Sequence, residues 1–120
     1  MKKSIIEKKS YAFALRIIKL YTYLTNKKKE YILSKQVLRC GTSIGANVKE
    51  GVQAESKSDF IHKLNIALKE ASETDYWLNL LKDSEIIDNT SFESISKDCI
   101  ELIKIMTAII KTSRKNLAIK

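Results

Sequence analysis

Proline is absent from this chain of 120 residues, and glycine occurs only three times, at Gly41, Gly45 and Gly51. A chain of average composition and this length would hold about six prolines and eight glycines. These two residue types build the turns of β-sandwiches and the loops that cradle phosphate groups. Their scarcity argues against an all-β fold and against Rossmann or P-loop sites. With 44% apolar and 30% charged residues, the composition predicts an all-α protein of a few long helices.

The length fits a single domain, residues 1–120, large enough to bury a core without cross-links. No apolar run approaches the roughly 20 residues that span a bilayer. The chain begins Met-Lys-Lys-Ser-Ile-Ile, like a secretory signal, but Glu7, Lys8 and Lys9 end the apolar stretch at once. We therefore expect a soluble, cytoplasmic protein with no membrane partner.

Residues able to bind a metal or perform catalysis are few. Cys40 and Cys99 lie far apart, and His62 is the only histidine, so the common zinc spacings are excluded. The pattern predicts buried thiols in a reducing compartment. No nucleophile, base and third group occur in a recognisable arrangement. We expect no enzymatic activity, no catalytic residue, no metal, no cofactor and no small-molecule substrate.

Four segments have helical periodicity, at about 5–26, 34–55, 58–83 and 91–116. Capping patterns precede three of them: Ser4 with Glu7, Ser56 with Asp59, and Thr90 with Glu93. The candidate core residues include Phe13, Ile17, Ile18, Leu20, Leu24, Val37, Ile44, Val48, Val52, Leu64, Ala71, Leu78, Cys99, Leu102 and Met106. Short connections between long helices favour an antiparallel up-down-up-down four-helix bundle.

All three glycines fall in the second segment, where each weakens a helix by up to about 1 kcal/mol relative to alanine. Gly41 and Gly45 are four residues apart and share a face, and Ser43 and Asn47 form a neighbouring line of small polar side chains. Close packing against another helix is the favoured interpretation, and a glycine-hinged functional site is the alternative.

Charge is unevenly distributed along the chain. Residues 1–50 hold 12 basic and 3 acidic side chains, residues 51–110 hold 6 and 11, and residues 111–120 hold 4 and none, so the net charges are +9, −5 and +4. This asymmetry suggests an anionic partner, or oppositely charged surfaces that meet each other.

An up-down bundle places the start of the first helix beside the end of the fourth. We call the lysines and arginine gathered there the basic end: Lys2, Lys3, Lys8, Lys9, Lys111, Arg114, Lys115 and Lys120. Such a group of cations can contact the phosphates of RNA or DNA, and a solvated surface is the alternative. Tyr21, Tyr23 and Tyr31 flank Lys19 and Lys27–Lys29, where aromatic rings can stack on bases.

The second and third segments also allow a pairing prediction. If their hairpin turns near residues 56–57, facing positions have numbers that sum to about 113, which sets Arg39 opposite Glu73. We expect an ion pair that fixes the register of the two helices.

The run from Leu33 to Gly51, LSKQVLRCGTSIGANVKEG, strongly resembles the signature of the four-helix-bundle proteins encoded by intervening sequences of bacterial 23S ribosomal RNA genes. Residues Asp59 to Leu78 are also similar to that family, and Phe13 to Leu24 resemble its first helix more loosely. The resemblance implies an antiparallel four-helix bundle, often a homopentamer. A distant branch of the family contains the basic pentameric accessory protein of diversity-generating retroelements, which works with a reverse transcriptase and nucleic acid.

Two functions follow as hypotheses. The first is a non-enzymatic oligomeric module that binds RNA or DNA through the basic end. The second is a protein–protein adaptor or scaffold, in which the segregated charges serve assembly of the homo-oligomer.

Overall fold

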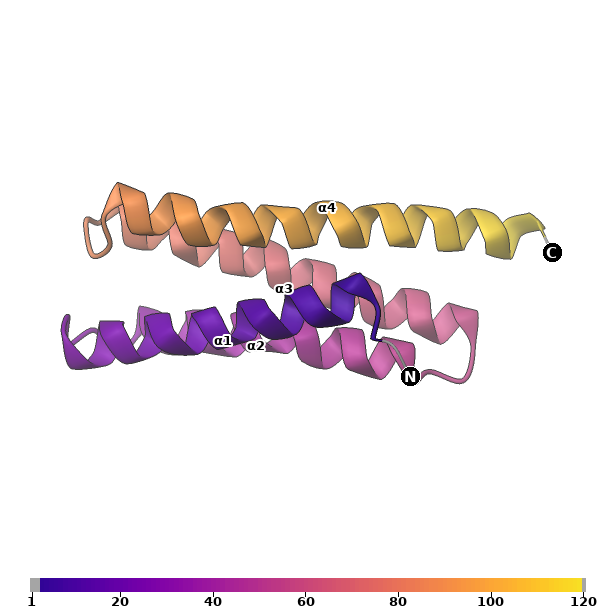
Figure 1. Ribbon diagram of the computed structural model, residues 1–120, viewed down its shortest axis with the longest axis horizontal. Helices are drawn as coiled ribbons and strands as arrows, with labels where there is room; N and C mark the ends of the chain where they lie inside the picture. Colours follow the sequence, from indigo (N-terminus) through magenta and orange to yellow (C-terminus); the bar gives the residue numbers. More distant parts are fainter. Residues whose placement is uncertain (1–2, 120) are drawn as a thin grey trace.

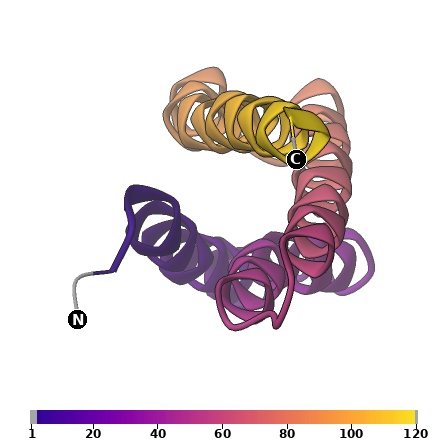
Figure 2. The same ribbon diagram turned by 90° about the vertical axis from the view of Figure 1, so that its right-hand side faces the viewer.

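The computed structural model describes residues 3–119 as four helices that run back and forth along one axis, about 52 Å long (Figure 1). They are α1 (Ile5–Asn26), α2 (Leu33–Val52), α3 (Lys57–Asp83) and α4 (Asn89–Ile119). Each helix packs on the next, and α1 also contacts α4, though less extensively. The predicted all-α up-down-up-down bundle is confirmed. Seen along its axis, the bundle is open between α1 and α4 (Figure 2).

The ends of the helices follow from their caps. Ser4 and Glu7 form the predicted capping box, in which the Ser4 hydroxyl accepts the Glu7 N–H and the Glu7 carboxylate accepts the Ser4 N–H. The Ser56 hydroxyl accepts the Asp59 N–H at 3.1 Å, as its position before α3 predicts. The helices predicted from residues 5 and 58 therefore begin at or within one residue of the expected place.

The predicted cap of α4 is wrong. The helix begins at Asn89, because the Asp88 carboxylate accepts the backbone N–H of Ser91 at 2.7 Å and so acts as the N-cap. Thr90 and Glu93 lie inside the helix. At its other end α4 continues to Ile119, three residues beyond the prediction, and projects past the other helices (Figure 1).

A side chain from the preceding connection caps α2. The Glu30 carboxylate accepts backbone N–H groups from Ile32, Leu33 and Ser34 at 2.7–3.1 Å. Partial burial raises the pKa of Glu30, but these hydrogen bonds outweigh that effect and hold the pKa below its ordinary value. The helix therefore begins one residue before the predicted start.

The core runs along the inside of the bundle and contains most of the predicted residues. Of the fifteen candidates, twelve are buried, and Leu20 is partly buried and packs against the core. The prediction is wrong for Ile18 and Val52, which are 46% and 47% exposed. Both cysteines are buried free thiols, as predicted. Burial raises the pKa of both thiols, that of Cys99 to about 12.

Gly41 and Gly45 form the surface on which α1 packs. A Cβ added at Gly41 would lie 2.7 Å from Cγ1 of Ile17, and one at Gly45 would lie 3.4 Å from the carbonyl oxygen of Ser10. The favoured interpretation, close packing against another helix, is confirmed at Gly41, whereas at Gly45 an added Cβ would make about ordinary van der Waals contact with α1. Ser43 and Asn47 instead donate hydrogen bonds within α2, to the carbonyl groups of Arg39 and Ser43.

Candidate nucleic-acid interface

The basic end has two parts, one on each terminal helix. Lys3 and Lys8 are exposed at the start of α1, and Lys111, Arg114 and Lys115 are exposed near the end of α4. Lys2 and Lys120 lie outside the described residues. Both parts lie at the same end of the bundle (Figure 1), but the axial view places them on either side of the opening between α1 and α4 (Figure 2).

Lys9 is engaged in an ion pair. Its Nζ lies 3.0 Å from Oε1 of Glu101, so it joins α1 to α4. Further from this end, Arg16 makes a denser contact with α4. Its guanidinium lies 2.7 Å from the Asp98 carboxylate and donates two hydrogen bonds to Ser94, one to the hydroxyl and one to the carbonyl. The sequence did not reveal this contact.

The segregated charges therefore meet within the chain. The basic partners Lys9, Arg16 and Arg39 come from the +9 segment, and their acidic partners come from the −5 segment. In one further pair the segments are exchanged, because Lys63 belongs to the −5 segment and its partner Glu50 to the +9 segment. Charge segregation thus contributes to joining the two halves of the bundle, and only the basic groups outside these pairs remain for an anionic partner.

The structure brings Arg39 and Glu73 into contact, at the register expected from the hairpin. Arg39 also lies 3.5 Å from Glu70, and Oε2 of Glu73 accepts the indole N–H of Trp77 at 3.0 Å. The Arg39 side chain is half exposed, so solvent screens the attraction.

We expect a double-mutant cycle with Arg39→Met and Glu73→Gln to give a coupling energy of only about 0.5 kcal/mol, because half-exposed pairs contribute little. Urea unfolding of the four proteins measures it. A coupling energy indistinguishable from zero would remove the assigned role in register.

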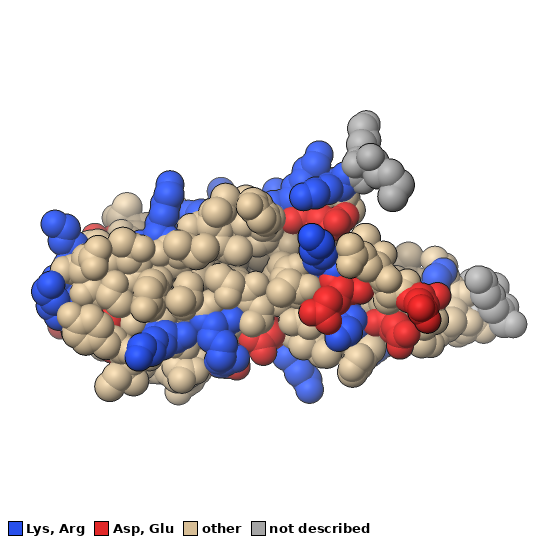
Figure 3. Space-filling model, turned by 90° about the horizontal axis from the view of Figure 1, so that it is seen from below, with Lys and Arg blue, Asp and Glu red and all other residues tan. Residues whose placement is uncertain are grey.

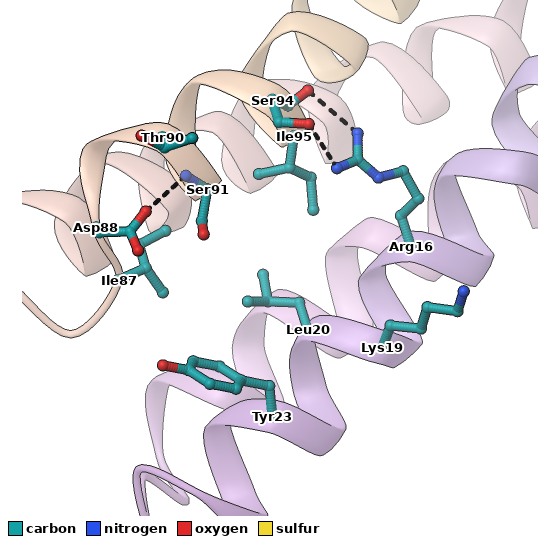
Figure 4. A pocket seen from close by; sticks show the side chains of 10 residues that line it. All are labelled: Arg16, Lys19, Leu20, Tyr23, Ile87, Asp88, Thr90, Ser91, Ser94 and Ile95. Carbon is teal, nitrogen blue, oxygen red and sulfur yellow. Dashed lines mark hydrogen bonds between the residues drawn. The ribbon is translucent and has the colours of Figure 1, made fainter.

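A groove of about 660 Å³ separates α1 from the start of α4 (Figure 4). Leu20, Ile87 and Ile95 make its apolar floor. Its other lining residues are polar or aromatic: Arg16, Lys19 and Tyr23 from α1, and Asp88, Thr90, Ser91 and Ser94 from the other side. Figure 4 shows the side chains of Leu20 and Ile95 turned toward each other across the groove, with the Tyr23 ring at one end.

A second groove adjoins the first and shares Tyr23, Ile87 and Asp88 with it. It adds Lys28, from the exposed lysine run between α1 and α2, and Lys28 helps to lower the pKa of Asp88 after the larger effect of the hydrogen bonds from Ser91. We call the two together the α1–α4 trough. Lysines 19 and 28 form no salt bridge within residues 3–119.

Two kinds of feature are missing from the part of the chain that the structure describes. Three or more His, Cys, Asp or Glu side chains never converge there in a way that could hold a metal ion. Among the same residues, no helix has both the length and the apolar character needed to cross a lipid bilayer.

The fold defines a class of protein: a small antiparallel four-helix bundle with charged outer faces. A family model described as 23S rRNA-intervening sequence protein matches residues 2–108. The chain belongs to the 23S rRNA-intervening sequence protein family. This confirms the family expected from the run between Leu33 and Gly51.

A solved structure supports the same assignment. The chain is similar to a protein of unknown function from the S23 ribosomal protein family of Bacteroides thetaiotaomicron VPI-5482, with 54% sequence identity and a TM-score of 0.88. The match covers 89% of this chain and 96% of the other. No curated protein matches the sequence significantly.

Proposed function

We propose that this protein is a non-enzymatic, oligomeric module that binds RNA or DNA in the cytoplasm through its basic end. The observation that carries the proposal is the charge of the second half of α4. After Glu101 the described chain contains Lys104, Lys111, Arg114 and Lys115 and no acidic residue, and these cations are exposed. Because α4 projects past the other helices (Figure 1), its end can reach phosphate groups without steric hindrance from the bundle.

Self-association has separate support on α1. Tyr11, Leu15 and Ile18 follow one line of the helix and are 64%, 49% and 46% exposed. Figure 3 shows a broad uncharged area on the face seen there, with Lys and Arg at its margins. A second copy could cover this apolar stripe and offer its acidic segment to the lysines. Five copies would agree with the family resemblance.

The test compares wild type with the triple variant Lys111→Gln, Arg114→Gln and Lys115→Gln. Fluorescence anisotropy of a labelled oligonucleotide, measured between about 50 and 200 mM salt, gives the affinity and its salt slope. We expect the triple variant to bind about tenfold more weakly or worse at the lowest salt. The slope of the logarithm of the binding constant against the logarithm of the salt concentration should be shallower by roughly one for each phosphate that the variant no longer neutralises.

The matched control removes three exposed lysines elsewhere, as Lys35→Gln, Lys69→Gln and Lys97→Gln, for the same change in net charge. If the two triple variants lose affinity equally, the nucleic acid is attracted only by the net charge of the protein and not by the basic end. If wild type does not bind nucleic acid, the proposal is overturned. Light scattering over the same salt series tests the adaptor hypothesis. That hypothesis is favoured if the oligomer dissociates as salt rises and nucleic acid does not bind.

A further inference from the structure

We infer that the α1–α4 trough holds an unpaired nucleotide, so that the protein prefers single-stranded nucleic acid to duplex. This inference rests on the proposed function and adds a second contact surface to it. The basic end supplies attraction to phosphate, which does not distinguish single strands from duplexes. The trough has features that do.

The first feature is an accessible aromatic ring beside an apolar floor. Tyr23 is 43% exposed, lines both parts of the trough, and lies at the end of the groove floored by Leu20 and Ile95 (Figure 4). A base presents two apolar faces only when it is unpaired and unstacked, and stacking on an aromatic side chain tolerates every base. A volume of about 660 Å³ falls within the range of sites for small molecules, so it is large enough for one nucleotide.

The second feature is the division of charge between the two rims. The α1 side carries Arg16 and Lys19, and Lys28 follows just after the helix. Because Lys19 and Lys28 have no salt-bridge partner among the described residues, both can pair with a phosphodiester. The opposite side carries Glu85, Asp88 and the hydroxyl groups of Thr90, Ser91 and Ser94. Lys82 also lies on that side, but its ammonium group is 3.7 Å from the Asp83 carboxylate and sits over the Phe92 ring.

This division orients the strand. A carboxylate repels phosphate, so the backbone of the strand follows the lysines of α1. The base then points toward the side that holds the hydroxyl groups, which can donate to or accept from the edge of any base. Asp88 is already hydrogen-bonded to the Ser91 N–H, and it caps α4. The helix end is therefore not itself the phosphate site.

The test uses a labelled single strand of about 16 nucleotides and a duplex of the same sequence, with affinities from fluorescence anisotropy at low salt. The variant Tyr23→Leu removes the ring and keeps an apolar side chain, and Tyr23→Phe keeps the ring. The matched control is Tyr76→Leu, which removes an exposed tyrosine on α3 outside the trough.

We expect wild type, Tyr23→Phe and Tyr76→Leu to bind the single strand alike. Tyr23→Leu should bind it roughly five- to tenfold more weakly, which is the effect of losing one stacked base. Duplex binding should not respond to Tyr23→Leu. A strand carrying bromouracil should also crosslink on irradiation to the tryptic peptide 20–27, which contains Tyr23.

The outcomes separate the two proposals. If wild type binds single strands and duplexes equally, and Tyr23→Leu binds the single strand as Tyr76→Leu does, the trough is not a nucleotide site while the proposed function stands. If crosslinks map only to peptides of the basic end, the inference is likewise overturned. If wild type binds neither nucleic acid, both proposals are overturned.

Discussion

Gly41→Ala is expected to lower the free energy of unfolding by about 2 kcal/mol, although alanine favours helices more than glycine does. The new Cβ would lie 2.7–3.0 Å from three side-chain atoms of Ile17, which is fully buried. Ile17 is branched at Cβ and has few rotamers to adopt, so α1 and α2 must move apart. Urea unfolding followed by circular dichroism measures the change.

Gly45→Ala is the matched control, one helical turn away on the same face. Its Cβ would approach no atom closer than 3.4 Å, at the Ser10 carbonyl oxygen, which borders on ordinary van der Waals contact. We expect this substitution to be neutral or to stabilise the helix by up to about 1 kcal/mol. Equal effects of the two substitutions would contradict the close approach of α1 at Gly41.

The second large effect concerns alkaline pH and Cys99. Burial raises the pKa of this thiol from 9.0 to about 12, and the nearby charge of Asp75 adds to the shift. Above pH 9 the unfolded chain loses the thiol proton and the folded chain keeps it, so the free energy of unfolding falls as pH rises. The decrease is about 1.4 kcal/mol for each pH unit up to about 12, roughly 4 kcal/mol in all.

Cys99→Ala isolates this contribution. The variant is less stable at neutral pH because it leaves a small cavity, but the difference between wild type and variant should narrow as pH rises above 9. Tyrosine and lysine titrations are common to both proteins and cancel in the difference. Unfolding by urea at a series of pH values, with a reductant present, measures it. If the free energies of unfolding of wild type and variant change in parallel from pH 9 to 12, burial does not raise the pKa of the Cys99 thiol.

The sequence was most informative where a short-range pattern sets the structure. Ser4 and Glu7 fix the start of α1 because their hydrogen bonds span three residues. The register of Arg39 against Glu73 could be predicted because the connection between α2 and α3 is short, so counting outward from the turn locates facing residues. Glycines spaced four apart predicted a close helix contact, but spacing alone did not identify α1 as the partner.

The features that could not be predicted are of two kinds. Some depend on which of two neighbouring residues forms a cap, and others join residues that are far apart in the sequence. Asp88 and Thr90 both suit an N-cap, and the sequence does not reveal which one the connection brings into place. Arg16 and Asp98 are 82 residues apart, and three connections separate their helices, so no counting rule pairs them. The α1–α4 trough could not be predicted for the same reason, although Tyr23 beside lysines was a visible signal of part of it.

The order in which the helices pack also bears on how the chain folds. Because each helix lies against its neighbour in sequence, most of the core forms by closing short connections, which requires little loss of chain entropy. Chains rich in such local contacts fold within microseconds to milliseconds. Among the described residues, only the contacts between α1 and α4 join helices that are not neighbours in the sequence, through pairs such as Arg16 with Asp98. Because α1 and α4 contact each other less extensively than neighbouring helices do, forming these contacts contributes little to the folding nucleus. Weakening them should therefore speed unfolding more than it slows folding.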